Sequence, residues 1–161
     1  MIITGYPGIG KSTLASENQN IIDLESSCFW KNEVDAAGHT VRTRPAEWYI
    51  YYCQMAEHLS KQGYIVFVSS HKEVRDYLSN NAKEKFCAIY PDITMKDEWI
   101  QMLTDRYTNT SDEKDLRALK HAQEHFCDDV KDFQAGSYTH IATLTGKNYS
   151  LKDIVQFLEN N

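Results

Sequence analysis

Short apolar runs rich in β-branched and aromatic residues alternate along the chain with longer stretches in which apolar residues recur at helical spacing. This alternation is typical of an α/β fold, in which helices cover a parallel sheet. The short runs predict five strands, at residues 1–4, 20–24, 64–69, 86–90 and 138–144. We therefore expect a three-layer domain with a five-stranded parallel sheet and helices on both faces.

The signals for helix ends place the intervening helices. Pro45 and Gly63 bound a helix whose apolar stripe reads as core packing. Ser70, with Glu73 three residues later, has the spacing of a capping box and predicts a helix after the third strand. A further helix is expected over residues 95–107, and a charged, helical stretch over residues 111–134 reads as a lid arm and the helix that returns from it. Thr94 with Asp97, and Ser150 with Asp153, are weaker signals for helix starts, of the same kind as Ser70 with Glu73.

The whole chain of 161 residues fits one domain, residues 1–161, with no linker or repeat. Its net charge of −6 counts against nucleic acid as a partner, so an anionic ligand would need a local group of donors. The four cysteines are widely spaced and have no metal-ligand pattern, which favours reduced thiols. No targeting segment or membrane span is recognisable. We expect a cytoplasmic protein, either a monomer or a homodimer.

One motif carries strong chemical information. Residues 5–12, GYPGIGKS, fit the phosphate-binding pattern GxxxxGK[ST] and stand between the first strand and a helix starting near Ser12. In such a loop the backbone N–H groups surround a phosphate, Lys11 reaches the β- and γ-oxygens, and Ser12 offers its hydroxyl to magnesium. The motif predicts binding of ATP and Mg²⁺ by Gly5, Tyr6, Pro7, Gly8, Ile9, Gly10, Lys11, Ser12 and Thr13.

Other P-loop classes lack support in the rest of the chain. No NKxD or DxxG sequence typical of a GTPase is present. The third strand continues into Ser69-Ser70-His71-Lys72, without the terminal Asp-Glu of motor ATPases. These absences favour a small kinase.

The chain resembles the nucleoside monophosphate kinase group of P-loop proteins, which includes shikimate and gluconate kinases. The likeness covers essentially the whole length and is concentrated in the phosphate loop and residues 69–78, SSHKEVRDYL. This second segment is similar to a gluconate-kinase segment and to one in phage-type kinases, some of which phosphorylate hydroxymethylated bases in DNA. The resemblance implies a P-loop kinase domain with an acceptor-binding region near residues 26–62 and a lid near residues 105–118.

Two carboxylates follow the second strand. Asp23 and Glu25 are two positions apart, so both side chains can face the same cleft, although a capped turn would explain them as well. The resemblance implies that Asp23 acts in catalysis and joins Ser12 at the magnesium ion, and that Glu25 contacts the acceptor. No aspartate ends the third strand to share the metal, which places more weight on Asp23.

Arginines neutralise the charge of a transferred phosphoryl group. The resemblance implies that Arg106 and Arg117 close over this group from the lid. The expected acceptor-binding residues, besides Glu25, are Arg42, Arg44, Ser70, His71 and Arg75; each also has an ordinary structural explanation. Residues 145–149 stand where family members close the adenine pocket.

The leading hypothesis is therefore an ATP- and Mg²⁺-dependent (deoxy)nucleoside monophosphate kinase acting on a small-molecule acceptor. A kinase of the gluconate or shikimate type is the alternative, and a kinase of hydroxymethylated bases in DNA is a third. An ATP-binding regulator without turnover is the non-enzyme alternative.

Overall fold

The computed structural model describes residues 1–161 and contains a five-stranded parallel sheet of order β2-β5-β1-β6-β7. All five strands predicted from the sequence are confirmed, with ends that differ by a residue or two. Because β1 is central, the loop that follows it opens at the middle of the sheet's carboxyl edge. The strands are β1 (Ile2–Gly5), β2 (Ile21–Asp23), β5 (Ile65–Val68), β6 (Phe86–Pro91) and β7 (His140–Leu144).

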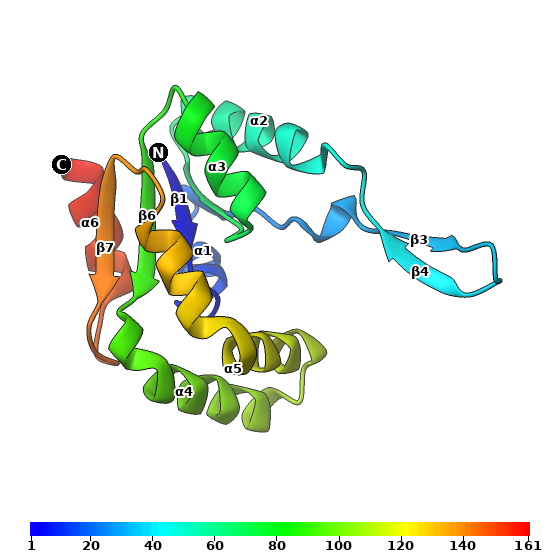
Figure 1. The fold of residues 1–161 in the computed structure, drawn as a ribbon. Helices are drawn as coiled ribbons and strands as arrows, with labels where there is room; N and C mark the ends of the chain where they lie inside the picture. Colours follow the sequence, from blue (N-terminus) through cyan, green and yellow to red (C-terminus); the bar gives the residue numbers. More distant parts are fainter.

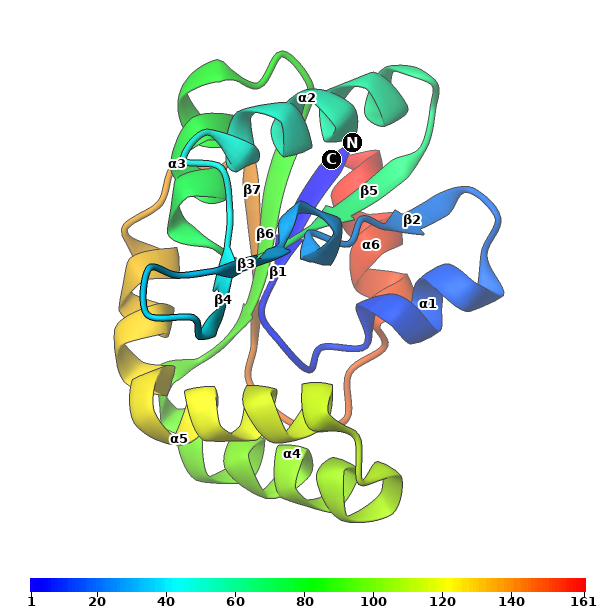
Figure 2. The same ribbon diagram turned by 90° about the vertical axis from the view of Figure 1, so that its right-hand side faces the viewer.

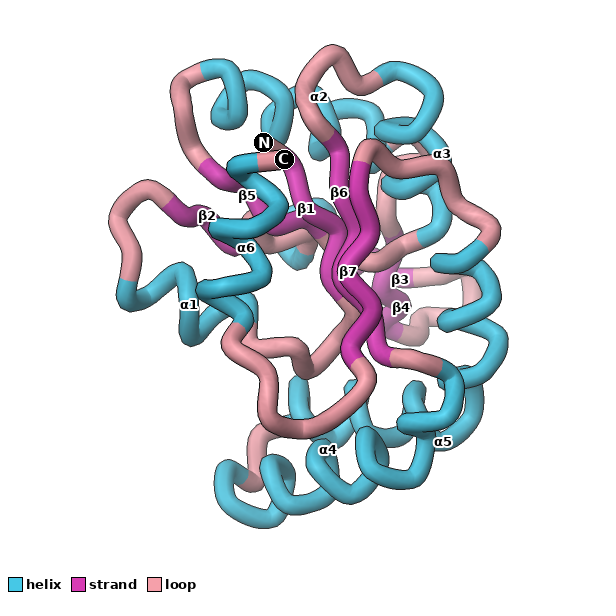
Figure 3. Tube along the Cα trace, turned by 90° about the vertical axis from the view of Figure 1, so that its left-hand side faces the viewer, coloured by secondary structure: helices cyan, strands magenta, loops and turns pink.

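Helices cover both faces of the sheet, so the α/β class and the layered arrangement are confirmed. Figure 3 shows α1 and α6 on one side of the strands and α3 and α5 on the other, with α4 beyond the carboxyl edge. The helices are α1 (Lys11–Glu17), α2 (Trp48–Lys61), α3 (Lys72–Asn81), α4 (Lys96–Thr110), α5 (Glu113–Gln134) and α6 (Leu151–Asn160).

The central strands divide the core into two parts. Ile3 belongs to the larger apolar cluster, which includes α1, α4, α5 and α6, whereas Ile2 belongs to a smaller cluster with α2 and α3. Neighbouring side chains on a strand point to opposite faces, so β1 contributes to both clusters. Strands buried on both faces are continuous apolar runs, which is why the sequence located them.

The predicted start of α3 differs from the structure, whereas that of α6 is confirmed. Ser70 is not the cap of α3: the helix begins at Lys72, its N-cap residue is His71, and no side chain caps it. The Ser70 carbonyl instead accepts a hydrogen bond from Arg75 Nε at 3.1 Å. By contrast, Ser150 caps α6 as predicted, since its side chain accepts from the Asp153 N–H.

Two further boundaries differ from the prediction. The helix expected from Pro45 begins at Trp48, because the Pro45 carbonyl closes only a turn with the Trp48 N–H, at 3.1 Å. Thr94 lies in a short 3₁₀ helix, Ile93–Met95, whose cap is Asp92, and α4 runs three residues beyond the predicted end at residue 107.

A β-hairpin was not predicted. Strands β3 (Lys31–Val34) and β4 (Thr40–Thr43) pair antiparallel within the expected acceptor-binding region, after a 3₁₀ turn at Ser27–Phe29. Figure 1 shows the hairpin extending away from the body of the molecule. Its side chains are almost all exposed, so no apolar alternation marks it in the sequence.

Helices α4 and α5 form an antiparallel pair beyond the carboxyl edge of the sheet (Figure 2). The turn between them contains Ser111 in the left-handed region, with φ of 53°, and Asp112 caps α5 by accepting from the Lys114 N–H. This pair occupies the place of the predicted lid. None of the helices combines the length and the apolar character that a bilayer crossing requires.

Candidate functional site

The predicted phosphate loop connects β1 to α1. Gly8 and Gly10 have φ of 94° and 99°, a region of backbone conformation that L-residues with side chains rarely adopt. A Cβ on Gly5 would lie 2.5 Å from Ile9 Cδ1. The backbone path thus requires glycine at positions 8 and 10, whereas a larger residue at position 5 would require the Ile9 side chain to move. The first N–H groups of α1 have no partners within the helix and remain available to a ligand.

Lys11 folds back over this loop. Its Nζ donates to the carbonyls of Gly5 at 2.9 Å and Tyr6 at 3.3 Å. Burial lowers the pKa of Lys11 from its ordinary value to about 8, while the nearby Asp23 carboxylate acts in the opposite direction. The ammonium is therefore positioned where a phosphate would be held, and its charge is less stable than that of an exposed lysine.

Ser12 and Asp23 come together from α1 and the end of β2. The Ser12 hydroxyl donates to Asp23 Oδ2 at 2.6 Å, which joins the two residues predicted to share a magnesium ion. A hydroxyl and a carboxylate at one point are ligands that Mg²⁺ accepts, because it uses few protein oxygens and keeps several waters. The residues present therefore fit an Mg²⁺ ion.

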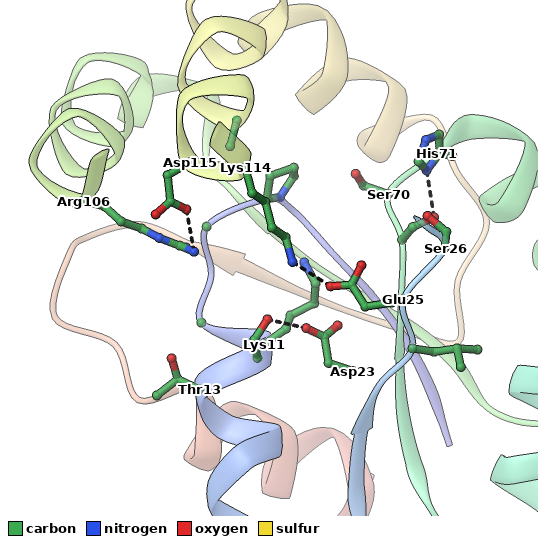
Figure 4. Close-up of a pocket in the computed structure, with 17 residues that line it drawn as sticks. Lys11, Thr13, Asp23, Glu25, Ser26, Ser70, His71, Arg106, Lys114 and Asp115 are labelled. Atoms are coloured by element: carbon green, nitrogen blue, oxygen red, sulfur yellow. Dashed lines mark hydrogen bonds and ion pairs between the residues drawn. The ribbon is translucent and has the colours of Figure 1, made fainter. Parts of the chain in front are cut away.

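These groups line a pocket of about 230 Å³, and α4 and α5 form its opposite wall. Figure 4 shows Lys114 of α5 reaching toward Glu25, and Nζ lies 2.6 Å from Glu25 Oε1. Arg106 of α4 lies 2.7 Å from Asp115, whose side chain is 6% exposed. Both cations that face the loop thus have carboxylate partners.

Sequence reasoning missed Lys114 and Asp115. They stand in a helix rich in charged residues, and nothing in their spacing distinguishes them from solvated neighbours. The one usable signal was the turn of residues 109–112, since a turn there directs the first residues of α5 back toward the phosphate loop.

The pocket is also lined by Ser26, Ser69, Ser70 and His71. His71 Nδ1 is 2.9 Å from Ser69 Oγ. Burial, followed by the nearby Arg44 guanidinium, lowers the pKa of His71, so its ring is neutral at pH 7. This wall consequently offers hydroxyls and a neutral imidazole.

Arg44 shapes the edge of the pocket instead of lining it. Its guanidinium lies 3.9 Å from the Trp48 ring centroid and 4.2 Å from that of Trp30. Nη2 donates to the Ser26 carbonyl at 2.7 Å, and buried Nε has no partner. Arg42 lies outside the pocket, 5.1 Å from the Trp30 ring.

The two other predicted arginines also lie outside this pocket. Arg75 is buried at 5% exposure, stacks over Phe133 at 4.4 Å and donates to the Asp132 carbonyl at 2.8 Å. Arg117 is on the exposed side of α5, where it pairs with Glu113 at 3.2 Å.

The predicted residues thus divide into three groups. Gly5, Tyr6 and Ile9 belong to the loop but do not line the pocket, and Arg42, Arg44, Arg75 and Arg117 lie apart from it. The residues that line the pocket are Pro7, Gly8, Gly10, Lys11, Ser12, Thr13, Asp23, Glu25, Ser70, His71 and Arg106.

The loop after β7, residues 145–149, lies against the phosphate loop. The Tyr149 hydroxyl donates to the Ile9 carbonyl at 3.2 Å. The loop predicted to close a base pocket is therefore adjacent to the predicted phosphate site.

Comparisons with known proteins were made for the whole chain. No protein-family model matches it, and no curated protein matches it. Among solved structures, it is similar to an uncharacterized protein from Eubacterium ventriosum ATCC 27560, with a TM-score of 0.49 and 10% sequence identity, over 99% of this chain and 97% of that chain.

Proposed function

We propose that this protein is an ATP- and Mg²⁺-dependent phosphotransferase with a P-loop kinase fold. The observation that carries the proposal is the loop of residues 5–12 at the carboxyl end of the central strand. Its two left-handed glycines, its inward lysine and its Ser12–Asp23 contact of 2.6 Å form one continuous surface. Ligands of open α/β sheets bind beyond the carboxyl ends of the strands, where this loop stands.

The loop side binds the donor. Backbone N–H groups of the loop and of α1 surround the β-phosphate, and the Lys11 ammonium exchanges its two carbonyl partners for phosphate oxygens. Ser12 and Asp23 would hold magnesium, which would neutralise part of the charge of the donor's phosphates. Residues 145–149 contact the base.

The helical pair α4–α5 completes the site from the other side as its lid. Arg106 and Lys114 are paired with Asp115 and Glu25. A triphosphate in the pocket competes with these carboxylates for both cations. Lys11 of the loop, together with Arg106 and Lys114 of the lid, then stabilises the charge that develops on the equatorial oxygens during transfer.

The acceptor is a second part of the proposal. Small size, the lid-like α4–α5 pair and the family resemblance support a (deoxy)nucleoside monophosphate in the cytoplasm. The arginines expected to bind its phosphate are engaged elsewhere, so the acceptor assignment has less support from geometry than the donor assignment. Gluconate- or shikimate-type acids and hydroxymethylated bases in DNA are the alternative acceptors. A regulator would bind ATP without transfer.

The test is Mg²⁺-dependent transfer of label from γ-labelled ATP to all ribo- and deoxynucleoside monophosphates, gluconate, shikimate and DNA with hydroxymethyluracil. Lys11→Ala should remove transfer, because the phosphate loses its cation inside the loop. Lys61→Ala is the matched control, since Lys61 is exposed in the last turn of α2. A folded Lys11→Ala protein with undiminished turnover would defeat the assignment.

A further inference from the structure

A second cavity, of about 380 Å³, adjoins the phosphate-loop pocket. Pro7, Ser70 and His71 line both spaces, so they form a shared wall. The far side of the second cavity is α5, which contributes His121 and Asp129. Tyr6 and Pro7 of the phosphate loop line this cavity directly, so a molecule bound there would contact the loop itself.

Asp129 connects the cavity to the phosphate loop itself. His121 Nε2 is 2.8 Å from Asp129 Oδ2, and the Tyr6 hydroxyl donates to the same oxygen at 3.5 Å. Burial and the Asp129 carboxylate raise the pKa of Tyr6, which keeps its hydroxyl protonated as a donor. Asp129 is 29% exposed, and its second oxygen has no partner within the protein.

The charges in this cavity are balanced. Lys72 and Arg75 oppose Asp129 and Asp132, and the lowered pKa of His71 leaves that ring uncharged. Arg75 is already bound to backbone carbonyls, and Lys72 lies 2.8 Å from Asp76. A dianionic phosphate would therefore find no free cation, whereas hydroxyl groups would find carboxylate and imidazole partners.

We propose that the second cavity binds a neutral, hydroxyl-bearing acceptor, such as a nucleoside or a sugar, and that His121 is the base that takes its proton. The proposal rests on the proposed function, since it requires the ATP site next to it. With Nε2 donating to Asp129, the free lone pair of the imidazole is on Nδ1. Asp129 is a positioning residue that fixes this tautomer.

The step balances as an ordinary phosphoryl transfer. The acceptor oxygen forms a bond to the γ-phosphorus of ATP, and the bond from that phosphorus to the bridging oxygen breaks, with its electron pair leaving on ADP. The acceptor O–H proton moves to His121 Nδ1 and then to solvent. A monophosphate acceptor would have no such proton to transfer at neutral pH, so the base and the hydroxyl acceptor belong together.

The experiment measures label transfer from γ-labelled ATP to nucleosides, aldoses and sugar acids beside the nucleoside monophosphates. We expect label on a hydroxyl compound and a fall in kcat of about 100-fold in His121→Ala, the size typical of a lost general base. Added imidazole should restore part of the turnover of that variant, which a purely structural role would not allow. Asp129→Asn should lower kcat while the affinity for an ATP analogue stays unchanged.

His125→Ala is the matched control, because His125 lies one turn from His121 with a ring-centroid distance of 5.0 Å and does not line the cavity. Label on monophosphates alone, label on no hydroxyl compound, or full turnover of His121→Ala would overturn the inference. Lys11-dependent transfer to a monophosphate would leave the proposed function intact. Failure to bind ATP would instead remove the proposed function.

Discussion

Lys11 is partly buried, yet the proposed phosphate binding requires its side chain to be charged. Its pKa of about 8 reflects loss of water around the ammonium, only partly compensated by Asp23. A bound triphosphate favours the ammonium, because opposite charges stabilise the charged form. Donor binding and protonation of Lys11 are therefore linked.

This linkage predicts the pH dependence of ATP affinity. In the free protein Lys11 is protonated below about pH 8 and loses its proton above it. As far as Lys11 is concerned, the affinity should be constant below that pH and fall above it, by up to about tenfold per pH unit. Calorimetry in two buffers of different ionisation enthalpy should show proton uptake on binding at pH 9. Lys11→Met should bind more weakly and show no such uptake; equal uptake in both proteins would contradict the assignment.

The sequence identified the loop side of the site and Arg106, but it missed Lys114 and Asp115 of the opposite wall. Lys11, Ser12 and Asp23 were found because a motif and a strand end restrict where their side chains can point. Lys114 reaches Glu25 only because the chain reverses at Ser111, and this reversal depends on the packing of α4 against α5. The positions of Arg44 and Arg75 depend on packing against the Trp30, Trp48 and Phe133 rings, which their local sequence pattern does not specify.

At the scale of single elements, two serines with the same sequence signal behave differently. Ser150 caps α6, and Ser70 makes no capping bond to α3. We expect Ser150→Ala to lower the free energy of unfolding by about 1 kcal/mol. Ser70→Ala should change it by less than about 0.5 kcal/mol. Urea unfolding measures both, and equal losses would show that Ser70 stabilises its helix after all.

A helix or strand could be predicted from the sequence where its buried apolar residues recur at the spacing typical of that element. Strands β1, β5 and β6 are buried throughout, the edge strands β2 and β7 only in part, and the 22-residue helix α5 keeps its helical period throughout. The hairpin β3–β4 has neither property. The side chains of β3 are all exposed, so only the backbone pairing of β3 with β4 defines the hairpin.

On the scale of the whole molecule, the hairpin is an appendage of the folded body. No residue between 30 and 44 belongs to either apolar cluster. An isolated two-stranded hairpin is marginal in water, and here the stacking of Arg44 between Trp30 and Trp48 attaches its base to the body. Its loss should therefore leave the core largely unchanged.

We predict that replacing residues 33–41 by an Asn-Gly turn shifts Tm by no more than about 3 °C. The affinity for an ATP analogue should stay unchanged, because the loop and α1 lie elsewhere. Calorimetry checks both, and a loss of cooperative unfolding would show that the hairpin supports the core.

The three tryptophans give the molecule a set of built-in optical reporters. Trp99 is 1% exposed beneath the phosphate loop, where its indole N–H donates to the Pro7 carbonyl at 3.1 Å. Trp48 is buried under the Arg44 guanidinium, and Trp30 is 38% exposed at the base of the hairpin. The fluorescence of an indole depends on its exposure and on nearby charge. Versions of the protein that keep one tryptophan at a time would thus let changes at the phosphate loop and at the base of the hairpin be followed separately, without an attached dye.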